Sequence, residues 1–208
     1  MKNCEHDVTI KPPARTRNAA ATRLAILRSA RAAFARSGYD GVGVREIAKG
    51  AGVTAMLINR YFGSKEQLFA EVVVDTMAQP VILTSQNLEA ASLSDSMASA
   101  LVELTTPGAA PLDGFMIMFH SASSARAAEI ARDQIERHHQ GVMASALQGD
   151  MAAERAALVL AVVAGVQVMR QMSGLSALTQ VDPQALQKLL APLLRGLIEG
   201  QPPPCDAR

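Results

Sequence analysis

The sequence contains no tryptophan, and aromatic residues make up only 3% of its 208 residues. Side chains that favour strands are therefore comparatively scarce, whereas the strong helix formers Ala and Leu are plentiful. Hydrophobic residues account for 49% of the chain, enough to bury a core made mainly of Ala, Leu, Val and Met. We find no useful segment with strand periodicity and no internal repeat, and we predict an all-α protein.

Cysteine is almost absent as well, and no membrane or export signal stands out. Cys4 and Cys205 lie in the two terminal tails, so no disulfide framework beyond that one pair can form, which fits a reducing cytoplasm. Residues 1–11 are polar and of mixed charge, unlike a signal peptide. The apolar run 156–166 is shorter than the about 20 residues of a membrane span. We expect a cytoplasmic protein with no membrane partner.

The net charge of +1 conceals an uneven distribution. Residues 1–70 contain 12 Lys or Arg against 5 Asp or Glu, whereas the remainder contains 8 against 14. A basic segment attached to an acidic body is typical of a nucleic-acid-binding domain joined to a module of another kind. A basic disordered tail would give the same balance, but most of these cations lie between Arg23 and Lys65, within a helix-periodic segment.

Hydrophobic spacing, capping residues and breaks predict about nine helices. They cover approximately residues 18–37, 45–49, 54–62, 64–79, 94–105, 111–119, 125–147, 152–172 and 182–199. We divide the chain into a flexible arm (1–17), a DNA-binding domain (18–66), a regulatory and dimerisation domain (67–200) and a disordered tail (201–208). Thr54, Ser94 and Asp182 are the expected N-caps, and Ser64 with Gln67 has the form of a capping box.

Two short helices joined by a glycine-containing turn follow the first long helix, as in a helix-turn-helix. Ile47 and Ala48 would form the buried face of the first short helix, and Gly52 permits the tight turn. The second short helix would present its outer, N-terminal face to the DNA major groove. The sequence therefore predicts a helix-turn-helix over about residues 45–61.

Many residues from Thr22 to Phe69 fit one further pattern at fixed spacing. They are Ile26, Leu27, Ala30, Phe34, Gly38, Tyr39 and the segments 44–48, 51–54 and 61–68. This pattern resembles the DNA-binding domain of the tetracycline-repressor (TetR) family. Residues 154–168 and 181–192 are similar, less specifically, to the helix pair through which many family members dimerise.

The resemblance implies the DNA-contacting residues. They are Arg45, Thr54, Ala55, Met56, Leu57, Asn59, Arg60, Tyr61 and Lys65. Thr54 would bind a phosphate through its hydroxyl and backbone N–H, and residues 55–57 would face base edges. Tyr61 and Lys65 would hold phosphates, and the N-terminus of the helix that Lys65 begins also favours an anion. Arg45 and Arg60 would reach the backbone or the bases.

Two positions depart from the family pattern. Val44 stands where members usually carry Thr, and Asn59 stands where they usually carry Tyr. Asn59 either pairs with the N6/N7 edge of adenine or donates weakly to a phosphate. Both interpretations stay open.

The resemblance further implies a homodimer on double-stranded DNA with a palindromic operator. A small, mostly apolar effector would favour a conformation with different spacing of the recognition helices, and so release a repressor. The candidate pocket residues are Met97, Leu101, Phe115, Met118, Phe119 and Met169. Core filling is the alternative role for each Met. His138 and His139 point about 100° apart with no completing cluster, so we expect no metal and no cofactor.

Three other functions compete with a ligand-released repressor. One is an activator, or a regulator that needs no small ligand. Another is a dimeric scaffold that has lost DNA binding, which the retained Thr54, Tyr61 and Lys65 argue against. The third is an enzyme, for which we find no glycine-rich phosphate loop, nucleophile signature or metal-ligand cluster.

Overall fold

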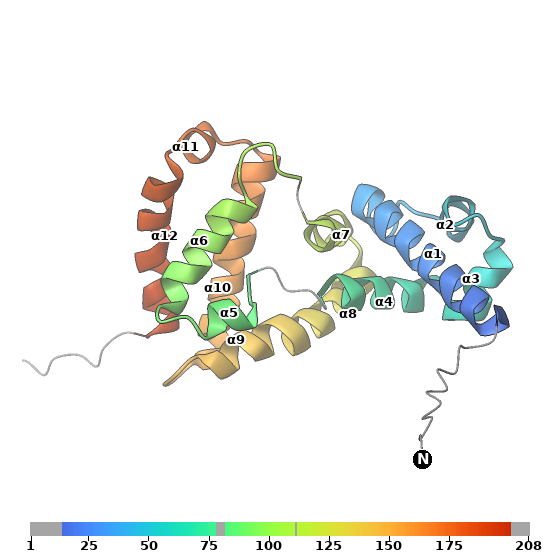
Figure 1. The fold of residues 1–208 in the computed structure, drawn as a ribbon, viewed down its shortest axis with the longest axis horizontal. Coiled ribbons are helices and arrows are strands. Elements are labelled where there is room, and N and C mark those ends of the chain that lie inside the picture. The colour runs from blue at the N-terminus through green and yellow to red at the C-terminus, as the bar shows by residue number, and fades with distance from the viewer. Residues whose placement is uncertain (1–13, 78–81, 111, 201–208) are drawn as a thin grey trace, which may run out of the picture.

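A computed structural model describes residues 14–77, 82–110 and 112–200, and these residues form helices and loops with no strand (Figure 1). The helices are α1 (Ala14–Ser37), α2 (Val44–Gly50), α3 (Ala55–Phe62), α4 (Lys65–Met77), α5 (Ser85–Leu88), α6 (Leu93–Leu104), α7 (Asp113–Ser121), α8 (Ala125–Ile135), η1 (Glu136–Gln140), α9 (Gly141–Ala146), α10 (Ala152–Gln167), η2 (Val168–Met172), α11 (Ser176–Thr179) and α12 (Pro183–Ile198). The elements η1 and η2 are π-helical turns that continue α8 and α10 without a break.

The all-α prediction is confirmed, and the nine expected helices each have a counterpart. The two single-turn helices α5 and α11 were not expected. α1 begins at Ala14, so it includes the last residues of the expected arm. The rest of that arm, Pro111 as a helix start, and the tail 201–208 lie outside the described residues.

Two of the four expected N-caps form their side-chain hydrogen bonds, and Thr54 caps α3 by position only. Ser64 Oγ accepts a hydrogen bond from Gln67 N at 3.1 Å, and Asp182 Oδ2 accepts one from Ala185 N at 2.9 Å. Ser94 is a correction, because Ser92 is the N-cap of α6 and Ser94 is buried inside the first turn. Both serines satisfy the local preference, and the packing of α6 decides between them.

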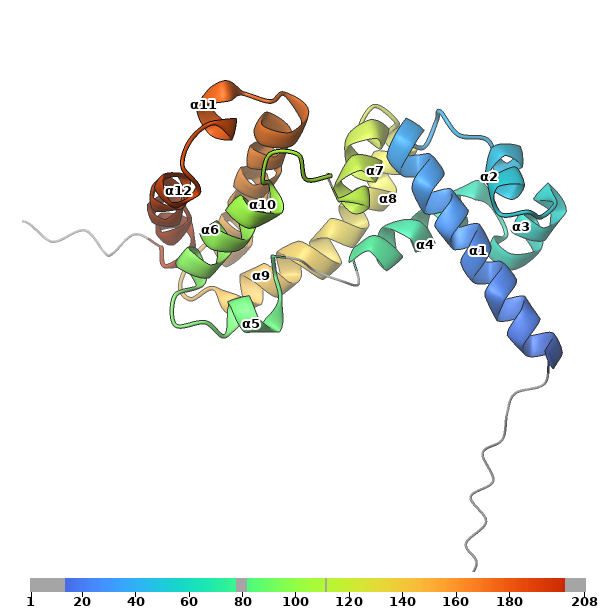
Figure 2. The same ribbon diagram turned by 45° about the horizontal axis from the view of Figure 1, so that its top comes forward.

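Two hydrophobic cores hold the described residues together. The first core joins α1, α2, α3 and α4 and also takes in Ile117 of α7 and Ala127 of α8. Phe34, Tyr39 and Phe69 meet at its centre, with ring centroids 5.0 to 6.3 Å apart. The second core joins α6, α9, α10 and α12. Helices α7 and α8 therefore lie between the two cores, as Figure 2 shows.

Helix α7 packs closely against the C-terminal end of α1 and the loop after it. Gly38 has a φ of +67° and lies so near His120 that a Cβ there would be 2.2 Å from the His120 carbonyl oxygen. His120 Nδ1 lies 2.7 Å from the carbonyl oxygen of Ala35, and Tyr39 N donates to Ser121 Oγ at 2.9 Å. The end of α1 is thus fixed to α7.

The helix formed by α10 and η2 is unusually apolar. Over Ala152–Met172 it is long and apolar enough to cross a membrane by length and composition, although the run expected from sequence was shorter. Two polar side chains of this helix are buried in the protein interior: Gln167 and Arg170 are each 4% exposed. Arg170 donates to the carbonyl oxygens of Leu178 and Val102 at 2.9 and 3.0 Å. Burial lowers the pKa of this guanidinium.

Candidate functional site

The outer face of α3 is exposed to solvent, while its inner face packs in the first core. Gly52 adopts a φ of +67° in the turn after α2, and Val53 N donates to Ala48 O at 2.9 Å, which closes the turn. Ile58 and Phe62 anchor the inner face of α3 in the core. The opposite face is therefore solvent-facing, and Met56 there is 80% exposed.

The N-terminus of α3 has unused hydrogen-bonding groups. Thr54 is the N-cap, with an extended backbone (φ −89°, ψ 153°), but its side chain makes no capping hydrogen bond. The first N–H groups of a helix have no partner within the helix. The exposed Thr54 hydroxyl and these N–H groups can thus bind an external anion such as a phosphate.

Exposed cations surround α3. Within the described part of the chain, no carboxylate forms an ion pair with Arg45, Lys49 or Arg60. Other cations of this domain are occupied, for example Arg36, which binds Glu46 at 2.6 Å. The free cations can therefore bind the DNA backbone. Lys49 was missed from the sequence, because only its exposure at the end of α2 distinguishes it.

The residues that the sequence predicts to contact DNA differ in their exposure to solvent. Thr54, Met56, Asn59 and Arg60 are exposed on α3, and Arg45 is exposed at the start of α2. Ala55, Leu57, Tyr61 and Lys65 are half-buried, and Ala55 and Tyr61 also pack against the first core. Lys65 Nζ lies 4.3 Å from the ring centroid of Tyr39, so its ammonium rests on an aromatic face.

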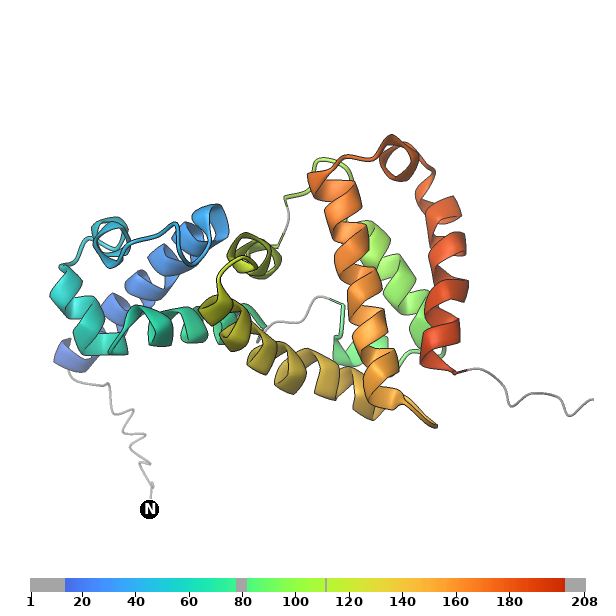
Figure 3. The same cartoon turned by 180° about the vertical axis from the view of Figure 1, so that it is seen from behind.

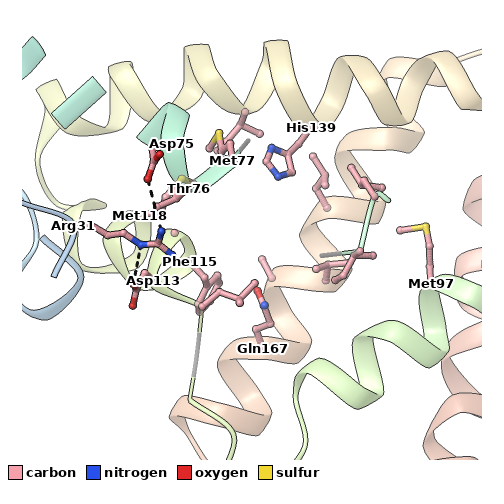
Figure 4. Close-up of a pocket in the computed structure, with 18 residues that line it drawn as sticks. Arg31, Asp75, Thr76, Met77, Met97, Asp113, Phe115, Met118, His139 and Gln167 are labelled. Carbon is pink, nitrogen blue, oxygen red and sulfur yellow. Dashed lines mark hydrogen bonds and ion pairs between the residues drawn. The ribbon is translucent and has the colours of Figure 1, made fainter. Parts of the chain in front are cut away.

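A cavity of about 350 Å³ lies between the two cores (Figure 4). Its apolar wall consists of Met77, Ile82, Leu83, Met97, Leu112, Phe115, Met118, Ile135, Leu160, Val163 and Ala164. A site of this size and character is typical of small-molecule binding.

Two polar side chains of the cavity have no hydrogen-bond partner among the described residues. Gln167 points into the cavity and is 4% exposed, and no partner is present for its amide. His139 Nδ1 is buried without a partner. Burial lowers the pKa of His139, and His138 lowers it further. Buried polar groups are usually satisfied, so these two are available to a ligand.

Charged residues from three helices meet at one side of the cavity. Arg31 of α1 binds Asp113 of α7 through Nε at 2.8 Å and lies 3.7 Å from Asp75 of α4 through Nη1. Figure 4 shows the guanidinium between the two carboxylates. These ion pairs connect α1 to both α4 and α7.

Three of the six expected pocket residues, Met97, Phe115 and Met118, line this cavity. The other three do not, which corrects the expectation. Leu101 is fully buried in the second core, while Phe119 and Met169 are about half exposed on the outside. Successive helical residues point about 100° apart, and the sequence does not show which direction faces a cavity. We did not predict from the sequence that Arg31, His139 and Gln167 line the cavity. Gln167 could have been noticed, because it is a polar residue that interrupts an apolar run.

Helices α10 and α12 expose a second apolar surface. It consists of Leu158, Ala161, Val162, Gly165 and Met169 on one helix and Leu189, Pro192, Leu193 and Gly196 on the other. Leu189 is 71% exposed, and a Cβ added at Gly165 or Gly196 would meet nothing within 4 Å. Figure 3 shows both helices at the end of the molecule away from α3. Such a surface is typical of a protein interface.

The described residues contain no group of three or more His, Cys, Asp or Glu side chains that could hold a metal ion. His138 is exposed and His139 faces the cavity, so the histidine pair does not converge on one point.

Comparisons with known proteins agree with this arrangement. Residues 26–72 match the family model for bacterial regulatory proteins of the tetR family, and residues 91–198 match the model for the tetracyclin repressor-like C-terminal domain. No curated protein matches the chain.

Several solved structures share the fold. GusR of Salmonella enterica superimposes with a TM-score of 0.67 at 19% identity, over 85% of this chain and 95% of that one. A TetR-family regulator of Streptomyces coelicolor gives 0.56 at 21% identity, over 90% and 98%. NalD of Pseudomonas aeruginosa, the secondary repressor of the MexAB-OprM multidrug efflux pump, gives 0.61 at 21% identity, over 89% and 100%.

Proposed function

Because the chain belongs to the TetR family, it is a DNA-binding transcriptional regulator, and we propose that it is a homodimeric repressor released from its operator by a small molecule. Family members are DNA-binding regulators and not enzymes, so the enzyme alternative is set aside. A regulator of this kind acts where the DNA is, and the proposed location is the cytoplasm.

The exposed face of α3 is the observation that carries the DNA-binding part of the proposal. Thr54 offers a hydroxyl without a partner at the helix start, and Arg45, Lys49 and Arg60 are cations without a carboxylate partner among the described residues. We propose that α3 enters the major groove with Ala55, Met56, Leu57 and Asn59 at base edges. Tyr61 and Lys65 would contact the flanking phosphates.

The apolar surface of α10 and α12 supports the homodimer. Two such helices from each protomer would form a four-helix bundle, in which Gly165 and Gly196 allow the partner helices to approach closely. A two-fold dimer places its recognition helices on half-sites separated by about one or more turns of DNA, roughly 34 Å each. The operator is therefore expected to be palindromic. Burial of this surface in a dimer would account for the length and apolar character of α10 and η2.

The cavity supports control by an effector. It lies between α1 and α4 of the first core and α10 of the second, so a ligand there contacts both parts of the chain. The effector shifts the equilibrium only by its differential affinity for the two conformations. The mostly apolar wall favours a small, largely apolar molecule.

The first experiment is binding of the purified protein to labelled DNA flanking its own gene, measured over a series of salt concentrations. Selective, salt-sensitive binding by a dimer is the expected result. If this DNA and unrelated DNA bind equally weakly, the next step is selection of a binding site from a pool of random DNA. Failure of that selection to yield a preferred site as well would contradict the proposal. Matched variants test the surface: Arg60→Ala should weaken binding, whereas Arg137→Ala, an exposed cation of η1, should not.

A reporter gene placed under the operator separates repression from activation. Expression that rises when the regulator is deleted supports repression, and expression that falls supports an activator. Unchanged operator affinity across a broad effector library would contradict control by a ligand.

A further inference from the structure

The cavity carries a formal negative charge. Its charged lining residues are Arg31, Asp75 and Asp113, which sum to −1, and burial keeps His139 neutral by lowering its pKa. The rest of the wall is mainly apolar, so no other described lining residue supplies a positive charge that would balance this negative charge. A ligand with one positive charge would neutralise the site.

Arg31 occupies the place that such a positive charge would take. Its guanidinium lies between Asp113, at 2.8 Å, and Asp75, at 3.7 Å (Figure 4). All three side chains are 41 to 49% exposed, so the ion pairs are screened and weak. An incoming cation can therefore replace Arg31 without disrupting a buried network.

An anionic ligand fits the same site poorly. A carboxylate that approached Arg31 would meet two carboxylates already bound to it, and like charges repel. The second observation that points to a ligand is Gln167, which is 4% exposed, aimed into the cavity and without a partner among the described residues. Its amide can accept a hydrogen bond from a ligand N–H group.

We propose that the effector is a cationic amphiphile, with an ammonium group that replaces Arg31 between Asp75 and Asp113 and an apolar body that fills the cavity. This inference rests on the proposed function, since it names the class of ligand for the same cavity. It also gives the regulatory step. Arg31 belongs to α1, while its partners belong to α4 and α7. An ammonium group that replaces Arg31 therefore breaks the two ion pairs that join α1 to these helices.

The test uses three probes that share one apolar tail: octylammonium, octanol and octanoate. Each is titrated into the full-length protein by calorimetry. We expect octylammonium to bind about two- to fivefold more tightly than octanol, the range for a charge pair that is partly exposed, and octanoate to bind most weakly. Operator binding is measured on the same preparation.

Variants identify the carboxylates that are responsible. Asp113→Asn should reduce the preference for octylammonium over octanol to about onefold. The control is Glu71→Gln, which breaks the ion pair between Arg23 of α1 and Glu71 of α4 away from the cavity, and it should keep the full preference. Arg31→Gln removes the internal competitor, so octylammonium should bind more tightly while octanol is unchanged.

Equal binding of octylammonium and octanol would overturn the proposal, as would tightest binding of octanoate or a preference that survives in Asp113→Asn. If octanol still binds in any of these cases, the cavity remains the proposed effector site and only the preference for a cation is refuted. Binding of none of the three probes would overturn both this proposal and the effector role of the cavity. Operator binding then reports separately whether the DNA-binding function holds.

Discussion

Substitution of Gly38 by alanine tests the close packing of α7 on α1. A residue with a side chain in the left-handed region costs about 1–2 kcal/mol, and Gly38 has a φ of +67°. The added Cβ would also lie 2.2 Å from the carbonyl oxygen of His120, which forces α7 away from α1. The contacts His120–Ala35 and Tyr39–Ser121 would then be lost, at about 1 kcal/mol each. The expected cost is about 3–4 kcal/mol in unfolding free energy.

Gly52→Ala is the matched control. Gly52 has the same φ of +67°, but nothing lies within 4 Å of the position of its Cβ. This variant should lose only the backbone contribution of about 1–2 kcal/mol. Urea unfolding followed by circular dichroism, at one fixed protein concentration because the protein is expected to dimerise, gives both values. Equal losses in Gly38→Ala and Gly52→Ala would refute the tight contact between α1 and α7.

Three further predictions concern DNA, assembly and pH. Asn59→Ala should weaken binding by about 1–3 kcal/mol at a single A·T position if Asn59 reads adenine, and a uniform loss across operator variants would assign it to a phosphate instead. Leu193→Glu places a charge on the apolar surface of α12 and should shift the dimer towards monomer in light scattering, whereas Leu24→Glu, on the exposed side of α1, should not. Burial lowers the pKa of His139, so below pH 6.5 the unfolded chain binds more protons than the folded one, and the unfolding free energy should fall as the pH drops from 6.5 through the folded-state pKa. The loss should be smaller in His139→Gln, and equal curves for both proteins would contradict a buried, neutral His139.

The sequence predicts the helices well because their ends are encoded locally. Ser64 and Asp182 begin helices as expected, since a side-chain oxygen needs only a backbone N–H three residues away. The helix-turn-helix follows from equally local signals, namely Gly52 in the turn and the buried Ile47. Ser94 shows the limit, because Ser92 is an equally good local cap.

The cavity is less predictable, because it is formed by residues far apart in the sequence. Arg31, Asp75 and Asp113 come from three helices, and nothing in the neighbourhood of any one of them indicates the other two. The apolar residues near the cavity give no better guide, since Phe119 follows the cavity residue Met118 directly yet lies outside. Tertiary packing, and not periodicity, selects which apolar side chains meet a ligand.

The π-helical turn η1 has a consequence for how the chain can change in evolution. In a regular α-helix the side chains of Ala131 and Met143, both buried, would point about 120° apart around the helix axis. The π turn holds one extra residue without the usual rotation of about 100°, so the two side chains point in nearly the same direction. Ala131 and Met143 therefore bury the same side of one continuous helix, and the two buried residues Ala127 and Met143 on it belong to different cores. Deleting a single residue from η1 would restore α-helical geometry and leave both buried sides in register. The helix can thus lose one residue here without unfolding either core, and this is the stretch that carries His139 to the cavity wall.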